Sequence, residues 1–132
     1  MPTVGLNHIN LSGTRDVLDV LKDFYCEVIG LEVGARPNFP RAGYWLYAGG
    51  HPVVHLYEAA PNEARKTDVL TTFDHVAFTC EDSDAFEALL RRRRVEYSKA
   101  LVPGSDQVQL FLKDPAGVKV ELNFPAGLSL RA

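Results

Sequence analysis

The amino-acid sequence predicts an α+β protein built from two copies of one βαβββ unit. Short segments alternate apolar and polar residues, which is the period of a strand with one buried face. In each half of the chain, one segment with helical spacing of its apolar residues follows the first of these strands. His8 and His75 lie 67 positions apart, and His55 and Glu121 lie 66 apart, so the pattern repeats with a nearly constant offset. An internal repeat of this size indicates a duplicated architecture.

The first half carries clear signals for one helix and one hairpin. Thr14 is a suitable N-cap, because its hydroxyl can accept a hydrogen bond from a free N–H group, and Gly30 can end the helix. The buried stripe of this helix is predicted to hold Val17, Leu21, Phe24 and Val28. Gly49-Gly50 is typical of a hairpin turn. The predicted strands are residues 5–12, 31–33, 44–48 and 52–58, with a loop over 34–43 and a linker over 59–71.

The second half repeats this order. Asp82-Ser83-Asp84 precedes a predicted helix from about Ala85 to Arg93 or Arg94, and Asp114 to Gly117 form a turn before the last strand. The predicted strands are residues 73–79, 95–99, 107–113 and 118–124, and residues 125–132 are predicted to form a tail.

Length and composition limit the classes of function. A chain of 132 residues has the length of one domain, here a single domain of two repeats over about 4–58 and 72–124. A net charge of −3 and a pI near 5.8 argue against general binding to nucleic acid or to anionic membranes. No apolar run approaches the roughly 20 residues of a membrane span. Two cysteines and the lack of a signal-peptide pattern favour the cytoplasm, and we expect a small-molecule partner.

Polar residues interrupt the key strands on one side. Val54 and Leu56 share a face, so His55 points the other way, and Glu121 has the same relation to its neighbours in the last strand. We expect the helices to cover the apolar faces. The uncovered side is therefore predicted to carry His8, His55, His75 and Glu121.

Three imidazoles and one carboxylate suit a borderline divalent ion such as Zn, Ni, Fe or Mn. The absence of a thiolate argues against a structural zinc site. A histidine on a strand is often an ordinary surface residue, and His51 is assigned no function on that ground. The other four positions differ because the internal repeat relates them in pairs.

Four sequence motifs of this chain carry a resemblance to a known family. They are Gly5-Leu6-Asn7-His8, Phe24-Tyr25 before Ile29-Gly30-Leu31, Phe73-Asp74-His75-Val76-Ala77-Phe78, and Asp114-Pro115-Ala116-Gly117 leading to Val120-Glu121-Leu122. With the doubled βαβββ pattern, they make residues 4–124 resemble the vicinal oxygen chelate superfamily. That group contains glyoxalase I, methylmalonyl-CoA epimerase, extradiol dioxygenases, fosfomycin-resistance thiol transferases and bleomycin-resistance proteins.

The resemblance implies a cup-shaped mixed sheet, to which each unit contributes one half, with one divalent metal ion per site. By position the ligands would be His8, His75 and Glu121, with His55 at the remaining place. Small members of the family are commonly homodimers. We therefore expect a homodimer in which His8 and His55 of one chain face His75 and Glu121 of the other.

The resemblance leaves three functions open. In a glyoxalase-like lyase or isomerase, Glu121 would move a proton on a substrate chelated through its oxygens. His55 stands where glyoxalase I has a second carboxylate, so it would be a fourth ligand or a second acid/base. In a dioxygenase, His8, His75 and Glu121 would form an Fe(II) facial triad. The third function is ligand sequestration of the bleomycin-resistance type, which typically lacks the ligand set.

Two aromatic and basic segments could shape the substrate site. Trp45 and the tyrosines on either side of it, Tyr44 and Tyr47, are candidates to line a pocket. Arg36, Phe39 and Arg41 lie in the preceding loop, where elements of substrate specificity are expected. These assignments stand beside the plainer interpretation that aromatic residues on strands belong to the core.

Overall fold

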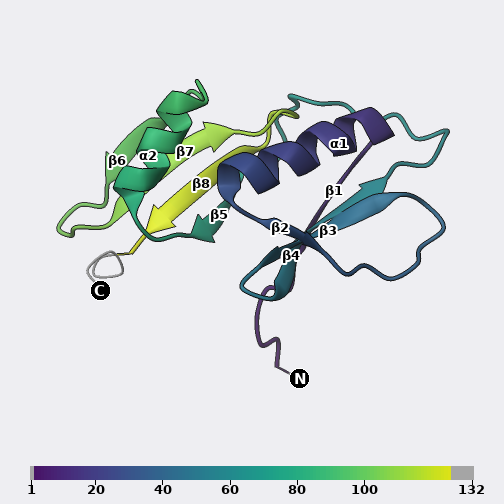
Figure 1. Cartoon of the computed structure of the whole chain (residues 1–132), viewed down its shortest axis with the longest axis horizontal. Helices are drawn as coiled ribbons and strands as arrows, with labels where there is room; N and C mark the ends of the chain where they lie inside the picture. Colours follow the sequence, from purple (N-terminus) through teal and green to yellow (C-terminus); the bar gives the residue numbers. More distant parts are fainter. Residues whose placement is uncertain (1, 126–132) are drawn as a thin grey trace. The chain divides into compact units, whose positions relative to one another are not determined.

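The computed structural model describes residues 2–125, which divide into two compact units between Lys66 and Thr67 (Figure 1). The boundary lies in the linker that the sequence predicts, and residues 59–74 contain no helix or strand. The predicted tail lies outside the described residues apart from Pro125. That the two repeats form a single domain stays a prediction.

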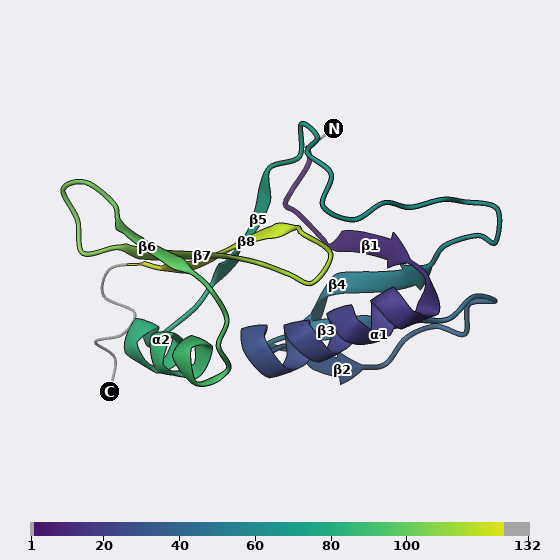
Figure 2. The same cartoon turned by 90° about the horizontal axis from the view of Figure 1, so that it is seen from above.

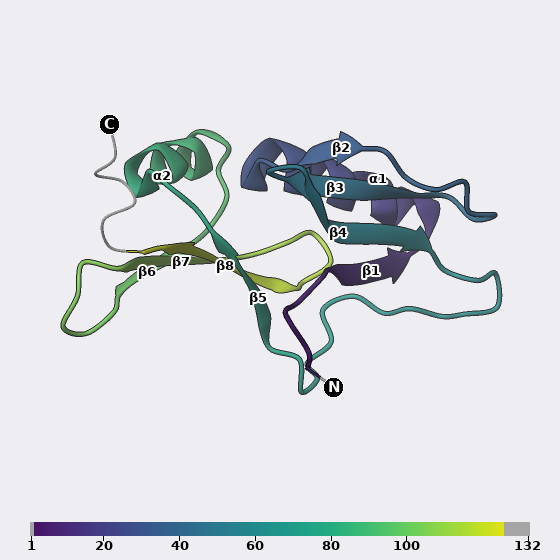
Figure 3. The same cartoon turned by 90° about the horizontal axis from the view of Figure 1, so that it is seen from below.

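The first unit is a four-stranded sheet with one long helix on one face (Figure 2). Its strand order is β1-β4-β3-β2, in which β1 and β4 are parallel and the other neighbours are antiparallel (Figure 3). Its elements are β1 (Ile9–Gly13), α1 (Arg15–Phe24), the π-helical turn η1 (Tyr25–Ile29), β2 (Glu32–Gly34), β3 (Gly43–Ala48) and β4 (His51–Glu58).

Helix α1 begins and continues as its sequence predicts, but its buried face is shifted. Thr14 Oγ1 accepts a hydrogen bond from the backbone N–H of Val17, and Gly30 ends the helical segment with a φ of 94°. The buried residues are Leu18, Leu21, Tyr25, Val28 and Ile29. The predicted stripe was therefore wrong at Val17 and Phe24, which are half-buried. The π-helical turn has more residues per turn than an α-helix, so it can turn both Val28 and Ile29 inward.

The second unit repeats the arrangement, with strand order β5-β8-β7-β6 and β5 parallel to β8. Helix α2 lies on one face of this sheet (Figure 2). Its elements are β5 (His75–Thr79), α2 (Ser83–Arg92), β6 (Ser98–Leu101), β7 (Val108–Lys113) and β8 (Lys119–Phe124).

Several boundaries in this unit differ from the prediction by one to three residues, among them those of the helix and of the strand after it. Asp82, with φ of 67°, is itself the N-cap and accepts a hydrogen bond from Ala85 N over 3.1 Å, so the helix begins at Ser83 instead of Ala85. The short strand predicted at 95–99 lies at 98–101, because pairing of Lys99 with Leu110 sets its position.

The observed architecture confirms the predicted α+β fold of two βαβββ units, each with a mixed sheet. In each unit, the strand that comes last in the sequence carries two apolar residues with no exposed surface. They are Val54 and Leu56 in β4, and Val120 and Leu122 in β8. The residue between them, His55 or Glu121, consequently lies on the opposite face. Among residues 2–125, no helix has the length and hydropathy needed to span a bilayer.

Candidate metal centre

The two units place their candidate ligands at the same register. In the first unit Asn10 of β1 lies opposite His55 of β4, and in the second Ala77 of β5 lies opposite Glu121 of β8. His8 and His75 each come two residues before these pairs. The structure therefore brings His8 to His55 and His75 to Glu121, one pair in each unit.

The rings of the first unit form a stack of three. His8 and His55 have ring centroids 3.7 Å apart and planes inclined by 13°. Trp45, opposite His55 on β3, covers its other face at 4.1 Å and 12°. His55 is thus held between an indole and a second imidazole, which fixes the plane of its ring.

Each ring of the first pair leaves one nitrogen for a ligand. His8 Nδ1 lies 2.8 Å from the amide oxygen of Asn7, which can only accept, so Nδ1 is the donor of this bond and Nε2 takes no part in it. His55 Nε2 is buried and has no hydrogen-bond partner. Burial of the ring, together with the neighbouring His8, lowers the pKa of His55 and favours its neutral form.

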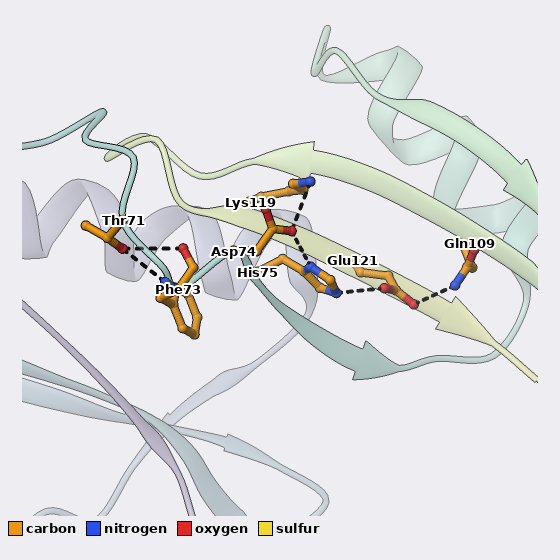
Figure 4. A network of polar contacts seen from close by, with 7 residues as sticks. All are labelled: Thr71, Phe73, Asp74, His75, Gln109, Lys119 and Glu121. Atoms are coloured by element: carbon orange, nitrogen blue, oxygen red, sulfur yellow. Dashed lines mark hydrogen bonds and ion pairs between the residues drawn. The ribbon is translucent and has the colours of Figure 1, made fainter.

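In the second unit a line of charged groups runs through His75 (Figure 4). His75 Nε2 lies 3.2 Å from Glu121 Oε1, and its Nδ1 lies 2.7 Å from Asp74 Oδ2. Lys119 Nζ approaches the same Asp74 oxygen at 3.1 Å. The carboxylate of Asp74 therefore orients the imidazole of His75, in the same way as the amide of Asn7 orients His8.

Glu121 is buried, with 6% of its surface exposed, and two amides hold one of its oxygens. Asn123 Nδ2 donates to Oε2 over 2.9 Å and Gln109 Nε2 over 3.2 Å. Gln107 in turn donates to the side-chain oxygen of Asn123 over 2.8 Å. These bonds compensate the burial of the charge and leave Oε1 directed at His75.

The sequence patterns did not predict these supporting residues. Asn7 and Asp74 could have been found, because each directly precedes its histidine with the offset of the repeat. Gln109 and Asn123 carry no signal in the sequence beyond their place on strands. His51, which was assigned no function, is exposed, and its Nε2 lies 2.9 Å from the backbone oxygen of Asn7.

The donor atoms fit a divalent metal ion. His8 presents the Nε2 that its bond to Asn7 does not use, His55 presents a buried Nε2 without a partner, and Glu121 presents an oriented oxygen. Oriented imidazole and carboxylate donors suit Zn, Ni, Mn or Fe. Over residues 2–125, no three His, Cys, Asp or Glu side chains gather into a preformed metal site, and the ligands stand as two pairs.

Comparisons with known proteins identify the family of the chain. Residues 5–122 match the model of the Glyoxalase/Bleomycin resistance protein/Dioxygenase superfamily. The chain belongs to this superfamily. Its members generally use a divalent metal ion and bind small molecules, as the sequence resemblance implied.

Individual relatives in the superfamily include proteins named as glyoxalases. The chain is 36% identical over 125 residues to Glyoxylase I 4 of Arabidopsis thaliana, with 89% of this chain and 68% of that protein covered. A glyoxalase family protein of Bacillus anthracis has a similar structure, with a TM-score of 0.71, 20% identity and coverage of 94% and 97%. Lactoylglutathione lyase of Agrobacterium tumefaciens also has a similar structure, with a TM-score of 0.66 and 18% identity, and the match covers 94% of this chain and 96% of that one. The two solved structures show the shared fold, and the curated relative supports an enzyme of this superfamily.

Proposed function

We propose that the chain is a divalent-metal-dependent, glyoxalase-like enzyme that transfers a proton on a small substrate chelated through neighbouring oxygens. His8, His55, His75 and Glu121 would hold the metal ion. The observation that carries the proposal is the repeated pairing. In each unit an oriented histidine, directly before β1 in the first unit and at the first residue of β5 in the second, lies beside a second donor on the last strand, at the same register.

The chain's own residues supply the proton chemistry. When bound, the metal ion would act as a Lewis acid and lower the cost of negative charge on a chelated oxygen. Glu121 is the candidate base, because two amides hold and orient Oε2, while Oε1 takes no bond from either amide and faces His75 Nε2 at 3.2 Å. His55 is the second candidate, since its lowered pKa keeps Nε2 able to accept a proton near neutrality.

Metal content tests the proposal directly. Protein prepared without an affinity tag or chelator is reconstituted anaerobically and analysed for Zn, Ni, Mn and Fe. We expect about one ion per chain in the wild type and a sharp loss in His8→Ala, His75→Ala and Glu121→Ala. His51→Gln is the matched control, because it removes an imidazole and keeps a donor for the Asn7 carbonyl. Equal metal content in all four variants would contradict the site.

His55 needs a separate variant, since it has two proposed roles. In His55→Ala, loss of metal together with activity on hydroxy-carbonyl or thiohemiacetal substrates indicates a ligand. Retained metal with lost turnover indicates a base. Labile Fe(II) with activity on catechol-like compounds would replace the proposal with the facial-triad dioxygenase, and no bound metal would replace it with ligand sequestration.

A mixing experiment tests the proposal that a homodimer shares its sites. His8→Ala chains and Glu121→Ala chains are each expected to bind little metal alone. If each site takes its first-unit residues from one chain and its second-unit residues from the other, the mixed dimer has one intact site of two. The isolated mixed dimer is therefore expected to hold about half the wild-type metal content, and a 1:1 mixture after random exchange of chains about a quarter. No recovery would place all four ligands within one chain.

A further inference from the structure

A pocket of about 250 Å³ opens beside His55 in the first unit, and most of its walls are aromatic. Phe39 lies against both of the other large rings, with its centroid 6.3 Å from that of Trp45 and 6.0 Å from that of Tyr57. Sites for drug-sized ligands have volumes of about 300–1,000 Å³, so this pocket has room for a group of about one ring. It is lined by Asn10, Phe39, Trp45, His55, Leu56 and Tyr57.

Asn10 provides a polar wall beside the rings. It lies opposite His55 in the pairing of β1 with β4, and Trp45 lies opposite His55 in the pairing of β3 with β4. Asn10 is exposed, and its side-chain amide forms no hydrogen bond within residues 2–125. A primary amide offers both N–H donors and a carbonyl acceptor. A ligand edge that carries N–H and C=O together can therefore pair with Asn10.

The charges around the pocket favour a neutral occupant. None of the lining residues is a lysine, arginine, aspartate or glutamate, so an ion would leave water without gaining an opposite charge. Two arginines of the loop before β3 line other pockets instead. The Cζ atom of Arg36 lies 5.0 Å from the ring centroid of Phe39, and that of Arg41 lies 5.3 Å from the ring centroid of Tyr57. A cation in the pocket would be repelled by these two charges.

We infer that this pocket binds a neutral, planar aromatic group with an amide edge, whose ring lies against Phe39, Trp45 and Tyr57 and whose N–H and C=O pair with Asn10. The inference rests on the proposed function, because it assigns a substrate class to the site that contains His55. Such an occupant would also cover Phe39, which is 40% exposed although it is a large apolar residue.

The chain provides its own reporter of binding. Trp45 is the only tryptophan of the sequence and forms one wall of the pocket, so its fluorescence is expected to respond to an occupant. We would titrate the protein with benzamide, with benzoate and benzamidinium as charged ligands of the same shape, and with cyclohexanecarboxamide, which keeps the amide on a ring that is not planar. EDTA in the buffer removes metal ions that would attract benzoate. Benzamide is expected to bind at least tenfold more tightly than each of the other three.

Variants separate the contact with the amide edge from the contact with the ring. Asn10→Asp is expected to weaken benzamide about tenfold and to bind benzamidinium about tenfold more tightly than the wild type does. Loss of folding cannot produce that gain. Phe39→Ala is expected to weaken benzamide about tenfold. Leu101→Ala removes an exposed apolar side chain from β6 of the other unit, so it should bind benzamide as the wild type does.

The outcomes distinguish this inference from the proposed function. Affinity for benzoate, benzamidinium or cyclohexanecarboxamide equal to that for benzamide, or no saturable change with benzamide, would overturn the inference whatever the metal content is. His75→Ala, which is expected to lose metal, should bind benzamide as the wild type does in EDTA. If the wild type binds no metal but the preference for benzamide holds, the proposed function fails and the pocket for a neutral ring stands.

Discussion

The imidazole of His75 donates its Nδ1 proton to the carboxylate of the residue before it, Asp74, over 2.7 Å. His8 makes the same bond to the amide oxygen of Asn7 over 2.8 Å. Both bonds join adjacent residues and leave Nε2 as the nitrogen outside the bond, which in His75 faces Glu121 Oε1 at 3.2 Å. The repeat has therefore kept the orientation of the histidine, while the orienting group is charged in one unit and neutral in the other.

The first prediction concerns Asp74. Asp74→Ala is expected to weaken metal binding about 10- to 100-fold, because the imidazole loses the acceptor that fixes its ring and raises its basicity. Asp74→Asn, which gives His75 the same amide neighbour that His8 has in Asn7, is expected to lose less metal affinity than Asp74→Ala. Competition with a chromophoric chelator measures both affinities. Asp106→Asn removes an exposed negative charge from a loop of the same unit and should have wild-type affinity. Wild-type affinity in Asp74→Ala would contradict an orienting role.

The second prediction concerns the support of Glu121. Asn123→Ala removes the shorter of the two bonds to Glu121 Oε2 and leaves Gln107 without its acceptor. We expect the free energy of unfolding, measured by urea denaturation, to fall by about 1–2 kcal/mol. Asn123→Asp is expected to lower the free energy of unfolding further at pH 7, since its carboxylate then lies against that of Glu121. Part of this loss should be recovered near pH 4, where carboxylates become protonated. Equal losses in the two variants at pH 7 would argue against contact between the side chains.

The third prediction follows from the lowered pKa of His55, which is caused first by burial and then by His8. Below the ordinary value near 6.5, the unfolded chain takes up a proton that the folded chain does not bind at this ring. Stability is therefore lost as the pH falls from about 6.5 to the folded value. His55→Phe keeps a flat ring beside Trp45 and removes the titration. In EDTA, its Tm is expected to depend less steeply on pH between 7 and 5 than that of the wild type, and parallel curves would contradict this origin.

The fourth prediction concerns Glu87, a buried carboxylate of α2 that holds three side chains of the second unit. Its oxygens accept from Tyr97 Oη at 2.7 Å, Lys99 Nζ at 2.9 Å and Arg91 Nη2 at 3.2 Å. The bonds from Lys99 and Tyr97 lower the pKa of Glu87 in the folded protein. They therefore stabilise the fold at a pH above the ordinary pKa of a glutamate, and this stabilisation is lost as the pH falls through the lowered pKa of the folded state.

Glu87→Gln is therefore expected to lose about 1–2 kcal/mol of unfolding free energy at pH 7, because its partners are partly exposed and the bonds are screened. The difference from the wild type should shrink below about pH 4.5. Urea denaturation at pH 7 and pH 4 measures both values. A loss that stays constant over this range would assign it to packing instead of charge.

The helix signals in the sequence were strong where one residue determines the outcome. Thr14 and Gly30 bound the first helical segment as predicted, because a cap depends on the residue itself. Where several residues compete, the prediction failed. Val17 and Leu18 could each belong to the apolar face of the helix. In the structure it is Leu18 that is buried, on the same face as Leu21 and the buried residues of η1.

Alternation in the sequence was sufficient to place His55 and Glu121 opposite the apolar faces of their strands, because side chains of a strand alternate with a fixed period of two. His75 begins β5 as part of the strand predicted there, whereas His8 lies directly before β1 and outside the strand that was predicted to contain it. Their surroundings depend on strands that are distant in the sequence. The stack of Trp45 on His55, the amides of Gln109 and Asn123 on Glu121, and the arginines behind Phe39 arise only when strand pairing and one loop bring these groups within contact distance. No local pattern encodes such contacts, since they are set by register and packing between segments.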